Sequence, residues 1–258
     1  KTFIVPVNLT YYPIRARDNA INKLISRFVK NMDDRFREEL EVEGTMVMEG
    51  VDIDINFGKP LEAGEYLHSN RKIRNMLADD RLYLDRSELK GLKPFHLLDL
   101  RFMHDYMDSI YGMTTVNHDH LFSYLLTRYP SNHIGENDFK NRAFLAVEKL
   151  RASGITNIHT SLAQKQFYLL TDDRHDKYDA FIQAASSRGL ISLNNGVITK
   201  NRRLFTQIYD FHTIRKDNII EVIKNEIEPL EVLTRELNRI MRQPPCWIRR
   251  KIRRHFIK

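Results

Sequence analysis

Cysteine and long apolar runs are the two most informative shortages in this sequence of 258 residues. A single cysteine, Cys246, excludes a fold built on internal disulfides, the usual solution for small secreted domains. A membrane span needs roughly 20 successive apolar residues, and the longest apolar runs, such as Phe3–Val7, are far shorter. No basic-then-apolar segment of the secretory type opens the chain. Together these features favour a reducing, cytoplasmic setting.

Acidic residues are missing from the last twelve positions, and this shapes the charge of the whole chain. The formal net charge is +7. Six cations and no acid lie between Trp247 and the last residue, which leaves a net charge of only +1 for the rest. The protein is therefore not basic throughout but carries a basic C-terminal segment. The hydrophobic content of 42% and the charged content of 29% are those of a globular chain with one or two domains.

The N-terminal quarter predicts a strand, a helix and a second strand. Phe3–Tyr12 is rich in β-forming residues, and the apolar residues of Asp18–Leu40 recur every three or four positions. Val51–Phe57 alternates apolar and polar residues up to Gly58, so Asp52 and Asp54 are expected on a solvated face. This order favours a crossover unit of an α/β sheet. Because the chain begins without Met just before an apolar strand, we expect it to be part of a longer protein.

Helical patterns dominate after Pro60. The last predicted helix, from about Asp217 to Met241, is interrupted by Pro229, and Asn195-Gly196 predicts a tight type I′ hairpin turn. The other predicted helices cover 66–77, 94–111, 118–128, 137–152 and 176–187. The predicted organisation is an α/β remnant at 1–65, a mostly α-helical domain with a β-hairpin at 66–243, and a basic amphipathic tail at 244–258.

Two N-terminal segments resemble a known enzyme family. Ile4–Tyr12, an apolar strand with Pro6 near its start, resembles the fourth conserved block of the bacterial glycerol-3-phosphate and 1-acylglycerol-3-phosphate acyltransferases. Ile53–Pro60, with its Phe-Gly-x-Pro ending, is similar to the strand that follows that block. The resemblance covers about the first quarter of the chain, and the helical remainder is similar only in layout to the C-terminal extension of larger members.

The resemblance implies a reaction and its partners. The family transfers an acyl group from acyl-carrier protein or coenzyme A to glycerol 3-phosphate or its 1-acyl derivative, at the cytoplasmic face of the inner membrane and without a cofactor. Its base is a His-x-x-x-x-Asp pair, and a Phe-Pro-Glu-Gly motif binds the acceptor phosphate. Both precede the fourth block, so the resemblance places them before Lys1 and leaves no catalytic residue in this chain. Pro6 is the one substrate-binding position that carries over.

Several motifs in the chain imitate catalytic or metal sites. His133 with Asp138, and His212 with Asp217, match His-x-x-x-x-Asp, but neither precedes a Phe-Pro-Glu-Gly sequence. Glu43-Gly44-Thr45 lacks the Phe-Pro that should precede it and predicts a turn. His118-Asp119-His120 could begin a metal site, but helix capping by Asn117 and Asp119 explains the pattern without metal. We therefore predict neither a catalytic dyad nor a metal site.

The basic tail is the segment with the clearest functional pattern. Apolar residues spaced by four alternate with cations, as in a short amphipathic helix that lies on an anionic membrane. A solvated cationic terminus is the alternative, and in either case the tail follows Pro244-Pro245 and need not pack on the core. The predicted membrane-binding residues are Trp247, Ile248, Arg249, Arg250, Lys251, Ile252, Arg253, Arg254 and Phe256.

A different class of function remains open. A helix over 176–187, Gly189 and the hairpin form the layout of a winged-helix module. Arg202 and Arg203 follow the hairpin, and the basic tail could follow phosphates. The candidate recognition helix, however, has only Lys177 and, just beyond its end, Arg188 as cations. We therefore expect no nucleic-acid partner, and a scaffold or interaction domain is the further alternative.

Overall fold

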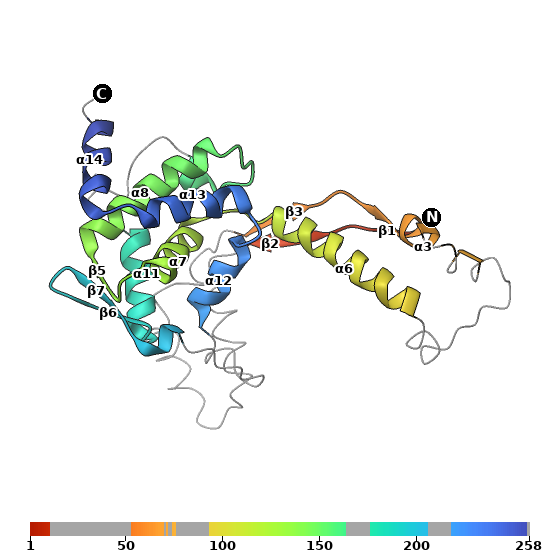
Figure 1. Cartoon of the computed structure of the whole chain (residues 1–258), viewed down its shortest axis with the longest axis horizontal. Coiled ribbons are helices and arrows are strands. Elements are labelled where there is room, and N and C mark those ends of the chain that lie inside the picture. The colour runs from red at the N-terminus through yellow and green to blue at the C-terminus, as the bar shows by residue number, and fades with distance from the viewer. Residues whose placement is uncertain are drawn as a thin grey trace, which may run out of the picture. The chain divides into compact units, whose positions relative to one another are not determined.

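The computed structural model describes residues 1–10, 53–69, 71, 74–75, 93–163, 176–205 and 218–256. It contains two compact units, each described by itself below (Figure 1). The first unit joins Lys1–Thr10 to Asp54–Thr114, and the second holds the described residues from Thr115 onward. The first unit thus extends well beyond the boundary near residue 65 that the sequence suggested. The helical content and the small antiparallel sheets agree with the predicted α/β remnant followed by a helical domain.

A two-stranded ribbon forms the N-terminal part of the first unit. β1 (Phe3–Ile4) pairs with β4 (Leu61–Glu62), and β2 (Val7–Thr10) pairs with β3 (Asp54–Phe57), both antiparallel. Between the two ladders, two residues on one side oppose three on the other, and each side contains a proline. Because proline has no N–H to donate, the ladder breaks there and its register shifts by one residue. Helices α3 (Ala63–Ser69) and α6 (Lys93–Gly112) complete the unit.

The pairing of β2 with β3 confirms that the two predicted strands are neighbours, but their direction differs from the prediction. A crossover unit requires parallel strands, whereas the register Val7 with Phe57 and Thr10 with Asp54 is antiparallel. The order strand, helix, strand does not fix strand direction, since a connection of this length can return the chain either way. The predicted helix over 18–40 lies outside the described residues.

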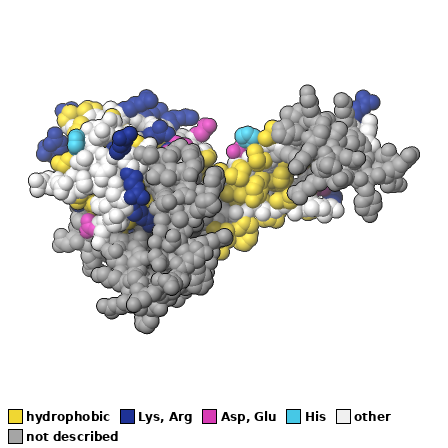
Figure 2. All heavy atoms as spheres, turned by 90° about the horizontal axis from the view of Figure 1, so that it is seen from below, with side chains coloured by type: hydrophobic (Ala, Val, Ile, Leu, Met, Phe, Trp, Pro, Cys, Tyr) yellow, Lys and Arg dark blue, Asp and Glu magenta, His cyan; other side chains and the backbone are white. Residues whose placement is uncertain are grey.

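The faces of the ribbon are the reverse of those expected from the sequence. Asn8 and Thr10 are buried, and Asp54 is half-buried, so the polar face is turned inward. Leu9, Ile55 and Phe57 are more than half exposed, at 57%, 53% and 72%. Figure 2 shows hydrophobic side chains gathered on the surface of the first unit. The expectation that the face of Asp54 is solvated was therefore wrong.

The second unit consists of helices and one small antiparallel sheet. In chain order its first elements are α7 (His118–Arg128), β5 (His133–Gly135), α8 (Glu136–Ala152), α9 (Thr160–Ala163) and α11 (Asp176–Ser187). They are followed by β6 (Ile191–Asn194), β7 (Val197–Lys200), the short 3₁₀ helix η1 (Arg202–Phe205), α12 (Ile219–Ile227), α13 (Glu231–Arg242) and α14 (Pro245–Phe256). The strands form one antiparallel sheet in the order β5-β7-β6.

Local signals set many of these boundaries as predicted. The Asn117 side chain accepts a hydrogen bond from the backbone N–H of His120 and begins α7. Asn195 and Gly196 both have positive φ, at 51° and 72°, as a type I′ turn requires. Gly189, with φ of 68°, follows α11, and Pro229 separates α12 from α13. The long final helix that the sequence predicted is thus two helices, and the break lies at Pro229, as expected.

The core of the second unit includes the C-terminal helix. Helix α14 contacts α8, and its Ile248 is fully buried while Ile252 is 9% exposed (Figure 1). The ring of His255 lies edge-on to Phe144 of α8, with centroids 5.2 Å apart. The sequence indicated only that this segment need not pack on the core, and the structure packs it there. Pro244 and Pro245 act instead as a sharp corner, because proline is well tolerated in the first turn of a helix.

Candidate functional site

The two segments that carry the family resemblance meet in the first unit. The Gly58 N–H donates to the Pro6 carbonyl at 2.8 Å, at the break between the two ladders. Gly58 also permits close approach to α6, because a Cβ there would lie 2.9 Å from Ser109 Oγ and 3.0 Å from the Met113 thioether. Pro6 is buried at this junction. Its position therefore has a structural role, and the described contacts do not test a role in substrate binding.

Two asparagines fix the ribbon to the end of α6. Asn8 Nδ2 donates to the Ile110 carbonyl at 3.1 Å and to Thr114 Oγ1 at 3.4 Å. Asn56 Nδ2 donates to the Met113 carbonyl at 3.0 Å. The Ile110 carbonyl also accepts the Met113 N–H at 3.1 Å, so the two amides add hydrogen bonds to carbonyls at and just beyond the end of α6. This explains why the polar face of the ribbon is the buried one.

His133 and Asp138 do not form a dyad. His133 is exposed on β5, and its Nδ1 lies 3.1 Å from Thr199 Oγ1. Asp138 Oδ2 instead accepts from Arg142 Nε at 2.8 Å and from the Tyr129 hydroxyl at 2.9 Å. The two side chains therefore have other partners in place of each other. The other match, His212 with Asp217, and the Glu43-Gly44-Thr45 turn lie outside the described residues.

His120 and Glu226 form a pair that the sequence did not reveal, because they lie 106 positions apart. His120 Nε2 is 2.9 Å from Glu226 Oε2, which links α7 to α12. His120 Nδ1 accepts the Asn117 backbone N–H at 3.1 Å, so Nε2 carries the proton and donates it to the carboxylate. With both ring nitrogens engaged, the imidazole has no free position to take a proton from a substrate. The pair is a helix cap and a link between helices.

His118 is buried beside this cap. Burial lowers its pKa to about 3, and Lys177 and His159 nearby act in the same direction. The imidazole is therefore neutral near pH 7, which suits its packing against Phe122 at a centroid distance of 5.9 Å. Among the described residues, no group of three His, Cys, Asp or Glu side chains is arranged to hold a metal ion.

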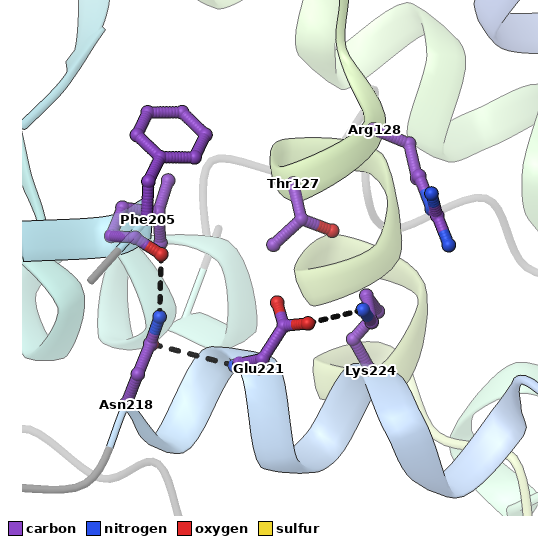
Figure 3. Close-up of a pocket in the computed structure, with 7 residues that line it drawn as sticks. Thr127, Arg128, Phe205, Asn218, Glu221 and Lys224 are labelled. Carbon is purple, nitrogen blue, oxygen red and sulfur yellow. Dashed lines mark hydrogen bonds and ion pairs between the residues drawn. The ribbon is translucent and has the colours of Figure 1, made fainter. Parts of the chain in front are cut away.

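A cavity of about 400 Å³ lies between α7, η1 and α12 (Figure 3). Its charged lining is already paired: Lys224 contacts Glu221, and Arg128 Nη2 lies 2.5 Å from Glu228 Oε1. Asn218 caps α12 and donates to the Leu204 carbonyl at 2.6 Å. A polar ligand would have to displace these internal contacts, so the cavity does not provide a binding site with free polar groups.

Lys200 lies close to this cavity and is 7% exposed. Its Nζ donates to the Tyr129 carbonyl at 2.6 Å and to the Thr127 carbonyl at 3.5 Å. Burial lowers its pKa to about 8. An amine with a lowered pKa beside a cavity can act as a nucleophile. Here it caps the last carbonyls of α7, which is a sufficient structural reason for its position.

Five cations of α14 are exposed, and the helix contains no acidic residue. Of the predicted membrane-binding residues, Ile248 and Ile252 are in the core, whereas Trp247 is 40% exposed. The exposed cations of the helix are Arg249, Arg250, Lys251, Arg253 and Arg254. The structure therefore separates the tryptophan from the two isoleucines with which the sequence pattern grouped it. The Phe256 side chain lies outside the described side chains.

The second unit has the element order of a winged helix. The described elements follow in the order α7, β5, α8, α9, α11 and the β6-β7 hairpin, and the sheet order is β5-β7-β6. The surfaces that such a module presents to DNA are poor in cations. The exposed positions of α11 include Lys177, Asp179 and Gln183, and the hairpin turn is Asn195-Gly196 between Leu193 and Val197. The charge of the unit is concentrated on α14 instead.

Comparison of the chain with protein-family models, with curated proteins and with solved structures found no match. In the part of the chain that the structure describes, no helix has the length and hydrophobicity needed to span a membrane.

Proposed function

We propose that this chain is the part of a glycerolipid acyltransferase that follows its catalytic histidine motif. The observation that carries the proposal is the junction of Pro6 with Gly58. Two segments more than forty residues apart, which separately resemble consecutive strands of that family, pair as β2 and β3 and hydrogen-bond at those two positions. A chance resemblance of two short segments would not require them to be neighbours.

The exposed apolar face of the ribbon also supports the proposal. Leu9, Ile55 and Phe57 point away from α6, and an apolar surface of this kind is usually covered by another part of a protein. In an acyltransferase domain, the portion carrying the His-x-x-x-x-Asp motif would cover it. The whole enzyme would transfer an acyl group from acyl-carrier protein or coenzyme A to glycerol 3-phosphate or a lysophospholipid, as a peripheral protein at the cytoplasmic face of the inner membrane.

The sequence encoded immediately before Lys1 provides the decisive test. We expect a His-x-x-x-x-Asp motif followed by Phe-Pro-Glu-Gly, and acyl transfer by the longer chain that vanishes when that histidine is replaced by alanine. Within the longer chain, Gly58→Ala should reduce transfer by crowding Met113, whereas Gly112→Ala, which meets open space, should not. An unrelated domain before Lys1 would defeat the proposal.

Nucleic-acid binding is the second candidate, and the winged-helix order of the second unit favours it. Fold alone does not establish function, and here the exposed cations near the candidate recognition surface are few: Lys177 on α11, and Arg202 and Arg203 after the hairpin. A fluorescence titration with duplex DNA at low and high salt separates the two candidates. Tight, salt-sensitive binding of duplex DNA that is lost when residues of α11 are changed would favour a nucleic-acid-binding function over the acyltransferase proposal.

A further inference from the structure

The direction of each side chain on α14 follows from its packing. Ile248 and Ile252, one turn apart, are buried against the core, and His255 is held edge-on to Phe144. These contacts fix the rotation of the helix about its own axis. The side chains of α14 that lie away from these contacts are exposed to solvent and can meet a partner without any rotation of the helix.

The outward side of α14 carries one aromatic residue among cations. Trp247, Arg250, Lys251 and Arg254 are spaced by three, four and seven positions, so they lie on one face of the helix. All four are exposed. None of the three cations makes a side-chain hydrogen bond or ion pair with a described residue, and no acid follows Trp247 in the sequence. We name these four residues the docking stripe.

We infer that the docking stripe binds the surface of an anionic lipid bilayer, with α14 lying flat and its two isoleucines remaining in the core. Three unpaired cations complement anionic headgroups, and an exposed tryptophan suits the interface between headgroups and hydrocarbon, where one side of its ring is apolar and its N–H is solvated. The inference rests on the proposed function, which brings the protein to lipid substrates.

This arrangement differs from an inserted amphipathic helix. A helix that buries its apolar face in the bilayer would have to release Ile248 and Ile252 from the core. The docking stripe needs no such release, because its tryptophan is already exposed among the cations. Binding is therefore expected to be mainly electrostatic, reversible and strongly dependent on ionic strength.

The only tryptophan of the chain lies in the stripe, so its fluorescence reports on the proposed contact directly. The full chain is titrated with vesicles of phosphatidylcholine alone and of phosphatidylcholine mixed with phosphatidylglycerol, at about 0.05 M and about 0.5 M salt. We expect a blue shift of the emission with the anionic vesicles at low salt, and quenching by brominated lipid. We expect little change with the neutral vesicles or at high salt.

A matched pair of triple variants tests whether the stripe or the overall charge is responsible. Arg250→Gln, Lys251→Gln and Arg254→Gln together should weaken vesicle binding by about 100-fold, since each cation near the surface contributes about five-fold. The control variant removes three exposed cations that lie in the first unit, outside the docking stripe. These changes, Lys59→Gln, Arg71→Gln and Arg74→Gln, should together alter vesicle binding less than about five-fold. Both variants should keep the melting temperature of the parent, because all six side chains are exposed.

Three outcomes would overturn the inference. The first is equal weakening in both triple variants, which would indicate attraction by net charge alone. The second is a Trp247→Ser variant that sediments with anionic vesicles as well as the parent does. The third is duplex DNA that displaces vesicles at equal phosphate concentration, which would identify nucleic acid as the partner. None of these results bears on the motif sought before Lys1, so failure of the stripe and failure of the proposed acyltransferase are distinguishable.

Discussion

Asn8 and Asn56 lie opposite each other across β2 and β3, and each donates its side-chain amide to a carbonyl at the end of α6. This pair turns the polar face of the ribbon inward and leaves the apolar face exposed. Hydrogen bonds at a helix end thus determine the orientation of the ribbon, in place of the burial of apolar residues that usually decides it.

Replacing Asn8 by alanine should destabilise the first unit. The change removes three hydrogen bonds, two donated to the Ile110 carbonyl and to Thr114 Oγ1 and one accepted from the Thr10 hydroxyl, so we expect a loss of about 1–3 kcal/mol in the free energy of unfolding. The matched control is Leu9→Ala, the exposed neighbour, which should cost less than about 0.5 kcal/mol. Urea denaturation followed by circular dichroism measures both, and a larger effect for Leu9 would show that the faces are assigned wrongly.

Arg142 should be among the most important side chains for the stability of the second unit. Its guanidinium is 2% exposed and donates to the carbonyls of Ile240 and Gln243 at 2.6 and 2.8 Å, and to Asp138 at 2.8 Å. We expect Arg142→Ala to cost about 3–5 kcal/mol, because it leaves buried partners of a charged group unsatisfied.

Two further variants sharpen the test of Arg142. Arg142→Lys keeps the charge but not the planar set of donors, so it should recover less than half of the loss. Lys149→Ala removes a half-exposed cation that pairs across the same two helices with Glu236 at 3.0 Å, and should cost at most about 1 kcal/mol. Similar losses in Arg142→Ala and Lys149→Ala would contradict the central role of the buried guanidinium.

The C-terminal helix should be necessary for the stability of the second unit. Ile248→Ala is expected to cost about 2–5 kcal/mol and Ile248→Val about 0.5–1.5 kcal/mol, as for a packed core position. Trp247→Ala, one residue away but 40% exposed, should cost much less. Deleting the residues from Trp247 onward should expose the core and lower the melting temperature sharply. Retention of the parent's melting temperature by the deleted chain would show that α14 is dispensable.

Acid should destabilise the second unit through His118. Burial lowers the pKa of its imidazole from the usual 6.5 to about 3. Between these values the unfolded chain binds a proton that the folded chain does not, so the free energy of unfolding falls as the pH decreases. One such group contributes at most about 1.4 kcal/mol per pH unit.

The variant His118→Gln isolates this contribution. Near pH 7 it should be less stable than the parent, because it loses the packing against Phe122. The difference in the free energy of unfolding between parent and variant should narrow as the pH is lowered towards about 4. Only the parent has a histidine at this position, which binds a proton in the unfolded chain and not in the folded one. Urea midpoints measured across this range provide the test, and a constant difference would mean that His118 does not titrate in this way.

The chain alone should transfer no acyl group from acyl-coenzyme A to glycerol 3-phosphate. General-base catalysis needs a base within hydrogen-bond reach of the acceptor hydroxyl. The two described candidates, His120 and His133, are engaged in structural contacts. Release of free coenzyme A, with heat-treated chain as the blank, measures the activity. Transfer that disappears in His133→Ala would show that the dismissed motif is the real one.

The sequence by itself determined where many elements begin and end. Asn117, Gly189, Asn195-Gly196 and Pro229 act on the backbone within one turn of themselves, so their effects do not depend on the rest of the fold. For this reason the predicted bounds of α7 and α11, the hairpin turn and the break between α12 and α13 agree with the structure. The two N-terminal strands were also recognised, although not their direction.

Only the tertiary structure decided which faces are covered and by what. The spacing of Ile248 and Ile252 shows that one side of α14 needs an apolar partner, but a bilayer and the side of α8 satisfy that need equally well. The alternation in β3 likewise predicts two different faces, yet it carries no information about the carbonyls of Ile110 and Met113, which accept hydrogen bonds from Asn8 and Asn56. Periodicity is a property of the segment alone. The choice of partner depends on groups distant in sequence, whose hydrogen-bonding and packing requirements become visible only when the chain has folded.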